Sequence, residues 1–148
     1  MRNDFCFKQE HNAFYGEVLK NIFSGEISLT TCLNFSLYFC YLFCDVNEIY
    51  VQSQKIFEDE LICHKNLAKL LANCGEKPIF FDKNYDFLPK NLPTKNMLEY
   101  AICLKEKCIV NIKIAKTKIK HKKILFCLDE IIKTYQNHKN IYSTLLGL

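Results

Sequence analysis

Hydrophobic residues recur along most of the chain at alternating steps of three and four, which is the spacing of one face of an α-helix. This pattern predicts four helices, over residues 13–44, 45–74, 94–118 and 121–146. The last helix has the clearest stripe, which consists of Ile124, Leu128, Ile131, Tyr135, His138, Tyr142 and Leu145. Asp45 with Glu48 is typical of a helix start, and Gly75 of a helix end. The pattern therefore predicts an all-α protein.

The connections between these helices differ in length. Residues 76–93 separate the second helix from the third and contain all three prolines of the chain, whereas the other two connections are short. A short connection, then a long one, then a short one is the pattern of a four-helix bundle with one crossover between its second and third helices. We expect residues 13–148 to form one such bundle domain, after an N-terminal tail of residues 1–12.

Composition supports a single helical domain and disfavours nucleic acid as a partner. The chain has 148 residues, of which 49% are hydrophobic, with only 4 glycines and 3 prolines. The net charge is +4, and Arg2 is the only arginine among 20 basic residues. Proteins that bind bases or phosphates through bidentate contacts normally use more arginine. We therefore expect no nucleic-acid partner.

Nine cysteines are present, in a chain long enough to build its own core without disulfides. No Cys-x-x-Cys or Cys-x-x-His pair occurs, which disfavours a structural zinc site. The N-terminal residues are polar and lack the apolar core of a secretory leader. We therefore expect a cytoplasmic protein in which most thiols serve as small hydrophobic groups. The frequent use of Lys, Asn, Ile and Phe suggests a bacterial genome rich in A and T.

Residues 27–44 include no charged side chain over 18 positions, the length at which a membrane span has to be considered. The stretch also contains Ser, Thr and Asn and lies between Glu26 and Asp45, so we expect a bundle helix and no membrane partner. Its aromatic residues off the inward stripe are Phe35, Tyr38, Phe39 and Tyr41. We expect them to contact the crossover or, in a homodimer, a second subunit.

Polar side chains interrupt each predicted stripe at one place. They are Glu26 in the first helix, Glu60 with Cys63 in the second, Glu106 in the third, and Tyr135 with His138 in the fourth. The third stripe, taken through Leu98, Ile102 and Ile109, directs Glu106 inward. Burying a carboxylate is costly unless it is paired or binds a metal. Bundles build two-metal sites from one Glu on each of two helices and Glu-x-x-His on each of the others, so we predict a metal centre in the core.

Four segments around these positions are GEISLTTCLNFSLYF, EDELICHKNLAKLLANCGEKPIF, LEYAICLKEKCIVNI and IIKTYQNHKNIY. Together they resemble the ferritin-like superfamily of di-iron and di-manganese carboxylate proteins, which includes bacterioferritin, rubrerythrin and manganese catalase. The likeness extends over about residues 13–146. It implies a ferritin-like four-helix bundle, a cofactor of iron or manganese, and either iron handling or the chemistry of peroxide and oxygen in an oxidoreductase.

The resemblance also implies which positions would bind the metal, and two of them differ from the superfamily. The six predicted metal ligands are Glu26, Glu60, Cys63, Glu106, Tyr135 and His138. Cys63 stands where the superfamily has a histidine, and Tyr135 where it has a glutamate. Thiolate and phenolate both bind iron, and a thiolate makes zinc credible as well. The sequence therefore predicts an altered metal site rather than the standard one.

Each of these residues also has a purely structural interpretation. The three glutamates can be ordinary paired or solvated charges, and Glu106 lies between two lysines. Cys63 can be a small core residue, Tyr135 a core tyrosine with a bonded hydroxyl, and His138 a satisfied core histidine. Two hypotheses remain open: a small cytoplasmic metal-binding redox protein, or a non-enzymatic bundle that lost its metal and acts as a structural or protein-interaction module.

Overall fold

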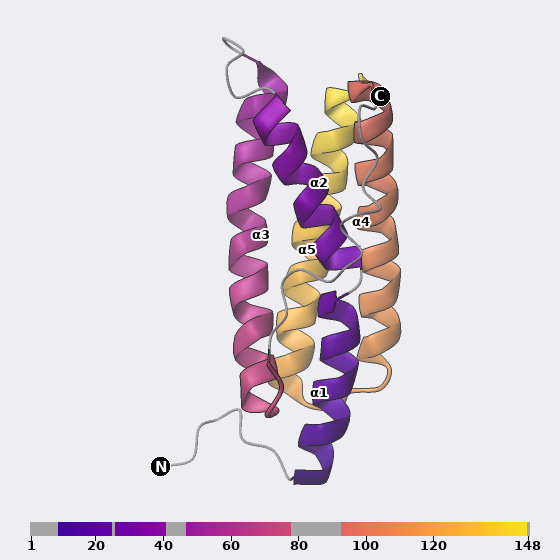
Figure 1. Cartoon of the computed structure of the whole chain (residues 1–148). Helices are drawn as coiled ribbons and strands as arrows, with labels where there is room; N and C mark the ends of the chain where they lie inside the picture. Colours follow the sequence, from indigo (N-terminus) through magenta and orange to yellow (C-terminus); the bar gives the residue numbers. More distant parts are fainter. Residues whose placement is uncertain (1–8, 25, 41–46, 78–92, 148) are drawn as a thin grey trace.

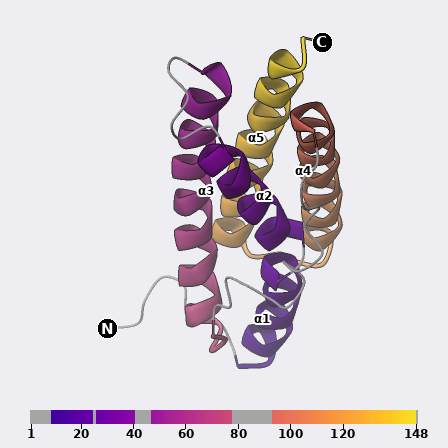
Figure 2. The same ribbon diagram turned by 45° about the horizontal axis from the view of Figure 1, so that its top comes forward.

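A computed structural model describes residues 9–24, 26–40, 47–77 and 93–147, and five α-helices lie within these ranges. They are α1 (Gln9–Ser24), α2 (Glu26–Cys40), α3 (Glu48–Asn73), α4 (Thr94–Lys116) and α5 (Lys122–Leu145). Helices α3, α4 and α5 run along the length of the bundle, whereas α1 and α2 follow one another along its remaining side (Figure 1; turned in Figure 2). The described residues contain no strand, which agrees with the predicted all-α class.

The order of the helices around the bundle decides which side chains can meet in its core. Helix α2 packs against α3 and α4, and α1 packs against the same two helices further along the bundle. Helix α5 also packs against α3 and α4. Helices α3 and α4 make no such contact with each other and therefore lie diagonally opposite. A side chain that reaches from α3 to α4 must cross the centre of the bundle.

The single helix predicted over residues 13–44 is wrong in one respect, because two helices occupy most of this range. Helix α1 begins at Gln9, within the expected tail, and ends at Ser24, and α2 begins at Glu26. The residue between the two helices, Gly25, lies outside the described ranges. Residues 1–8, 41–46 and 78–92 lie outside the described ranges, together with nearly all of the predicted crossover.

The ends of the other helices follow local sequence signals. Asn47 caps α3, and its side chain accepts a hydrogen bond from the backbone N–H of Ile49 at 2.8 Å. The capping residue is thus Asn47 and not Asp45, which lies outside the described residues. Gly75 follows α3 with φ of 82°, a left-handed conformation that favours glycine, so the predicted helix end is confirmed. Helix α4 begins at Thr94, directly after Pro93, as predicted.

Part of the uncharged stretch forms α2, and two of its aromatic side chains pack on α3. Phe35 meets Phe57 edge-on with ring centroids 4.9 Å apart, and Tyr38 stacks on Tyr50 at 5.1 Å. Phe35 and Tyr38, for which contacts with the crossover or a second subunit are predicted, thus contact α3. The side chain of Phe39 and all of Tyr41 lie outside the described part. No helix in the described ranges is long and apolar enough to cross a membrane.

Hydrophobic side chains fill the bundle in two clusters, and a polar layer separates them. Along α3, α4 and α5, one cluster ends at Ile56, Leu104 and Tyr142, and the other begins at Cys63, Cys108 and Tyr135. Three fully buried polar side chains lie between these levels, namely Glu60, Lys105 and His138. This layer is where the predicted site has to be sought.

Candidate functional site

An ion pair crosses the centre of the polar layer. The ammonium of Lys105 on α4 donates a hydrogen bond to Glu60 Oε1 on α3 over 2.5 Å, and both side chains are 0% exposed. Because α3 and α4 are diagonally opposite, this pair spans the core rather than a helix–helix groove. A buried charge is tolerated when it is paired and hydrogen-bonded, and each of these groups supplies the other's partner.

The same ammonium also contacts α5. Lys105 Nζ lies 3.9 Å from the centroid of the Tyr135 ring, which is within the range of a cation–π interaction. Burial raises the pKa of Tyr135 well above its usual value, and the nearby Cys108 and Glu60 act in the same direction. Tyr135 is therefore a neutral phenol whose ring faces a cation. One lysine thus connects α3, α4 and α5.

His138 completes the α5 side of the layer and is held by a carboxylate from α3. Its Nε2 lies 2.9 Å from Asp59 Oδ2. Burial and the charge of Lys105 lower the pKa of His138 to about 4, although Asp59 opposes this shift. A neutral ring beside a carboxylate carries its proton on Nε2, which leaves the Nδ1 lone pair free to accept. Asp59 is 34% exposed and lines a groove of about 230 Å³ between α3 and α5.

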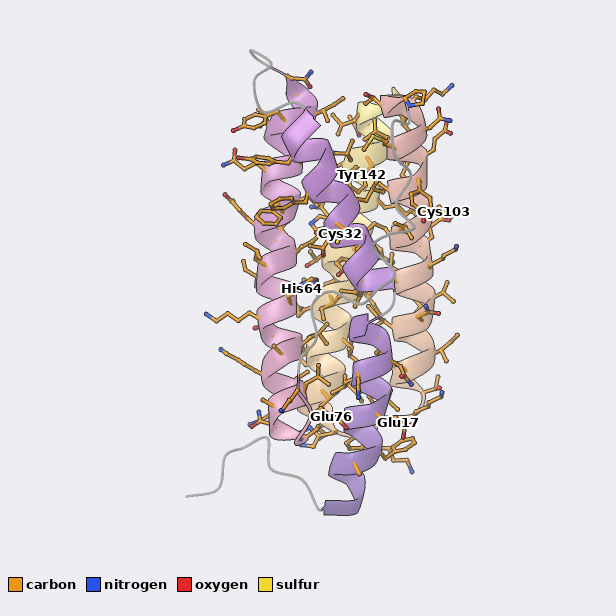
Figure 3. All side chains as sticks on the ribbon, viewed as in Figure 1. Glu17, Cys32, His64, Glu76, Cys103 and Tyr142 are labelled. Atoms are coloured by element: carbon orange, nitrogen blue, oxygen red, sulfur yellow. The ribbon has the colours of Figure 1, made fainter. Side chains whose placement is uncertain are left out.

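Two further residues of α3 face the interior. Cys63 is buried, and burial is the main reason that its pKa rises to about 12, so it is a neutral thiol. His64 is also buried, and its Nε2 lies 3.0 Å from Thr31 Oγ1 on α2. Figure 3 shows His64 on the side of α3 that faces α2. Burial and the charge of Lys105 lower the pKa of His64 to about 4. Both residues are thus uncharged.

Four of the six predicted ligands lie at or beside this layer, and one does not. Glu60, Cys63, Tyr135 and His138 are buried there, as the stripes of α3 and α5 indicate. The inward direction predicted for Glu106 is wrong, because its side chain is 55% exposed and pairs with Lys139 over 3.1 Å. Glu26 begins α2, but its side chain lies outside what the structure describes.

Lys105 is the residue at the centre of the layer that the sequence interpretation missed. A second stripe on α4 runs through Leu98, Ala101, Lys105, Cys108, Ile112 and Ala115, at alternating steps of three and four, and all six are buried. Glu106 is one residue further on and therefore about 100° away around the helix. The spacing signal for Lys105 is present in the sequence, but the predicted stripe through Leu98, Ile102 and Ile109 leads to Glu106 instead.

The described residues do not fit the two-metal centre that the resemblance implies. A divalent cation needs deprotonated acceptor groups, whereas Cys63 and Tyr135 are neutral and Glu60 is already paired with an ammonium. Within the described ranges, no three side chains among His, Cys, Asp and Glu are placed to hold one metal ion. The ion pair also brings the ammonium of Lys105 to a position where such a centre would need negative groups.

The layer still contains unused hydrogen-bonding capacity. Glu60 Oε2, the Tyr135 hydroxyl and His138 Nδ1 are buried and have no hydrogen-bond partner among the described residues. Most buried polar atoms in proteins have a partner. These three atoms therefore mark the part of the layer that the described side chains alone do not satisfy.

Comparison with known proteins identifies the fold. No family model matches the chain, and no curated protein sequence matches it. The structure is similar to that of the bacterioferritin of Desulfovibrio desulfuricans, with a TM-score of 0.80 over 99% of this chain and 84% of that one. The two sequences are 15% identical, and the description of that crystal structure names a diiron site in different catalytic states. The chain therefore has the ferritin-like four-helix bundle fold, which confirms the predicted fold class.

Proposed function

We propose that this protein is a ferritin-like bundle that works without a metal centre and acts as a structural or protein-interaction module. The observation that carries the proposal is the buried ion pair between Lys105 and Glu60. It balances the charge of Glu60, which is fully buried among the described residues. A bundle whose central carboxylate is already neutralised needs no cation to be stable.

The protonation of the neighbouring side chains supports the same conclusion. The Cys63 thiol and the Tyr135 phenol stay protonated at neutral pH because burial raises their pKa values. Neither can supply the anionic donor that a hard metal such as iron or manganese prefers. Oxidoreductase chemistry that depends on such a metal is therefore not part of this proposal.

Iron binding is the second candidate function, and two observations favour it. The fold is shared with a bacterioferritin whose description names a diiron site, which favours iron over manganese or zinc. In addition, Glu60 Oε2 and His138 Nδ1 are buried without partners among the described residues, and both are donor types that iron accepts. In this alternative Glu26 and Tyr135 would join them as ligands.

Metal analysis separates the two candidates. The protein is produced in cells supplemented with iron and manganese and purified without chelator, and its metal content is measured by mass spectrometry. Our proposal predicts less than about one tenth of an equivalent of any transition metal, and a melting temperature that a chelator leaves unchanged. About one equivalent of iron or more, with a melting temperature lowered by the chelator, would establish the second candidate instead.

We predict that the protein interacts with a second copy of itself through the aromatic side chains of α2. Phe35 stays 39% exposed although it packs against Phe57, and such aromatic groups are enriched at protein interfaces. Sedimentation of the wild type should show a dimer, and Phe35→Ser should weaken it by about tenfold or more. A wild type that stays monomeric at every concentration would exclude this partner while leaving the metal-free bundle intact.

A further inference from the structure

We propose that Lys105 takes the place of the metal ion in this bundle, and that its ammonium alone keeps a divalent cation away from the buried donor atoms of Glu60, Tyr135 and His138. This inference rests on the proposed function, because it explains how a ferritin-like core stays stable without metal. It adds that these donor atoms can still bind a metal ion once the ammonium is removed.

The position of the ammonium is the first argument. A metal ion at the centre of a bundle connects helices by binding one ligand from each. Lys105 Nζ does the same, because it projects from α4, bonds to Glu60 on α3 and lies over the ring of Tyr135 on α5. The ammonium is a single cation in contact with a carboxylate. It lies at the level along the bundle where the two apolar clusters end.

The arrangement of His138 is the second and independent argument. In metal sites, a ligand histidine commonly donates one ring N–H to a carboxylate, which fixes the ring so that its other nitrogen can bind the metal. His138 has this arrangement, since Nε2 is bonded to Asp59 and Nδ1 is buried without a partner among the described residues. A histidine that served only to fill the core would need neither the carboxylate nor an unsatisfied nitrogen.

Two further donor atoms, together with a groove beside the layer, agree with a latent metal site next to His138. Glu60 Oε2 and the Tyr135 hydroxyl are also buried without partners in the described part. With His138 Nδ1 they offer one carboxylate oxygen, one uncharged phenol oxygen and one nitrogen, and cobalt and zinc accept the carboxylate and imidazole donors. The groove between α3 and α5 is lined by Asp59 and Cys63, so it brings solvent up to the carboxylate that holds His138.

The direct test replaces the ammonium by a carboxylate. Lys105→Glu is titrated with Co²⁺ and compared with the wild type and with Lys107→Glu, which makes the same charge change at an exposed position of α4. The bound metal is counted by mass spectrometry, and its coordination is followed by visible absorption. We expect about one equivalent in Lys105→Glu, with the absorption of Co²⁺ in a protein site, and less than about one tenth in both controls.

A second pair of variants keeps the test interpretable if Lys105→Glu is unstable. Lys105→Gln removes the charge without adding a carboxylate, and folding of both variants is followed by circular dichroism with and without Co²⁺. We expect the metal to raise the melting temperature of both variants. Adding Asp59→Asn to Lys105→Glu should lower the Co²⁺ affinity by about 10- to 100-fold, because Asp59 orients the His138 ring.

The possible results separate a failure of this inference from a failure of the proposed function. Folded Lys105 variants that bind no more Co²⁺ than Lys107→Glu would overturn this inference and leave the metal-free function standing. Lys105 variants that stay unfolded even with Co²⁺ would overturn it as well, because the cation would then not replace the ammonium. A wild type that itself retains one equivalent of metal would instead overturn the proposed function.

Discussion

Lys105 Nζ and Glu60 Oε1 lie 2.5 Å apart across the diagonal of the bundle, and neither side chain is exposed. Removing one partner of such a pair leaves an uncompensated charge in the core, whereas replacing both partners by apolar groups removes the desolvation penalty as well. The pair therefore makes the stability of the bundle depend strongly on charge matching between α3 and α4.

The first prediction concerns this pair. Glu60→Ala should lower the free energy of unfolding by about 3–5 kcal/mol, because it leaves the Lys105 ammonium unpaired. Glu106→Ala is the matched control, since its exposed pair with Lys139 should contribute at most about 1 kcal/mol. The double variant Glu60→Leu with Lys105→Met should recover most of the loss. Urea unfolding measures all three, and a double variant as unstable as Glu60→Ala would contradict the account.

The second prediction compares two buried tyrosines of α5. The Tyr142 hydroxyl donates to Asn34 Oδ1 on α2 over 2.8 Å, and Asn34 in turn donates to the Ser53 carbonyl on α3. Tyr142→Phe should therefore cost about 1–3 kcal/mol, because the Asn34 oxygen stays buried and loses its donor.

Tyr135→Phe is the control for Tyr142→Phe, since both residues are 0% exposed. The Tyr135 hydroxyl has no hydrogen-bond partner among the described residues, and phenylalanine keeps the ring that faces Lys105. The free energy of unfolding should change by less than about 0.5 kcal/mol. Equal losses in the two variants would show that the Tyr135 hydroxyl is satisfied in the folded protein.

The third prediction concerns acid stability. The pKa values of His64 and His138 are lowered to about 4 in the folded protein, mainly by burial and further by the charge of Lys105. Their unperturbed value is about 6.5, so the unfolded state takes up protons first as the pH falls. Stability that is fully present above about pH 6.5 is therefore lost as the pH falls toward about 4, by up to about 3 kcal/mol for each histidine.

A variant without these histidines provides the check on acid stability. His64→Gln with His138→Gln should lose less stability than the wild type between about pH 7 and pH 4.5, whatever its absolute stability at neutral pH. The comparison is made from urea unfolding at the two pH values. Parallel losses in both proteins would show that other groups cause the acid sensitivity.

The fold was largely predictable because α3 and α5 each have one clean apolar stripe. Their stripes correctly place Glu60, Tyr135 and His138 in the core. The division into α1 and α2 was not predicted, because the helical spacing of residues 19–40 continues from one helix into the next.

The site was predicted less well because α4 carries apolar residues on more than one face. Val110 and Ile114 are more than half exposed, so hydrophobicity alone did not single out the buried stripe. The stripe through Ile102 and Glu106 was taken as the inward face, so a carboxylate ligand was expected where the Lys105 ammonium lies. Asp59 and His64 were missed because their roles come from contacts with other helices, which single-helix spacing does not reveal.

Anomalous X-ray scattering from a crystal of the wild-type protein soaked in Fe²⁺ tests the central claim most directly. The account predicts continuous density for the Lys105 side chain up to Glu60, and no anomalous peak between Glu60 and His138 at the iron absorption edge. An iron peak between those two residues, with the Lys105 ammonium displaced from Glu60, would contradict it.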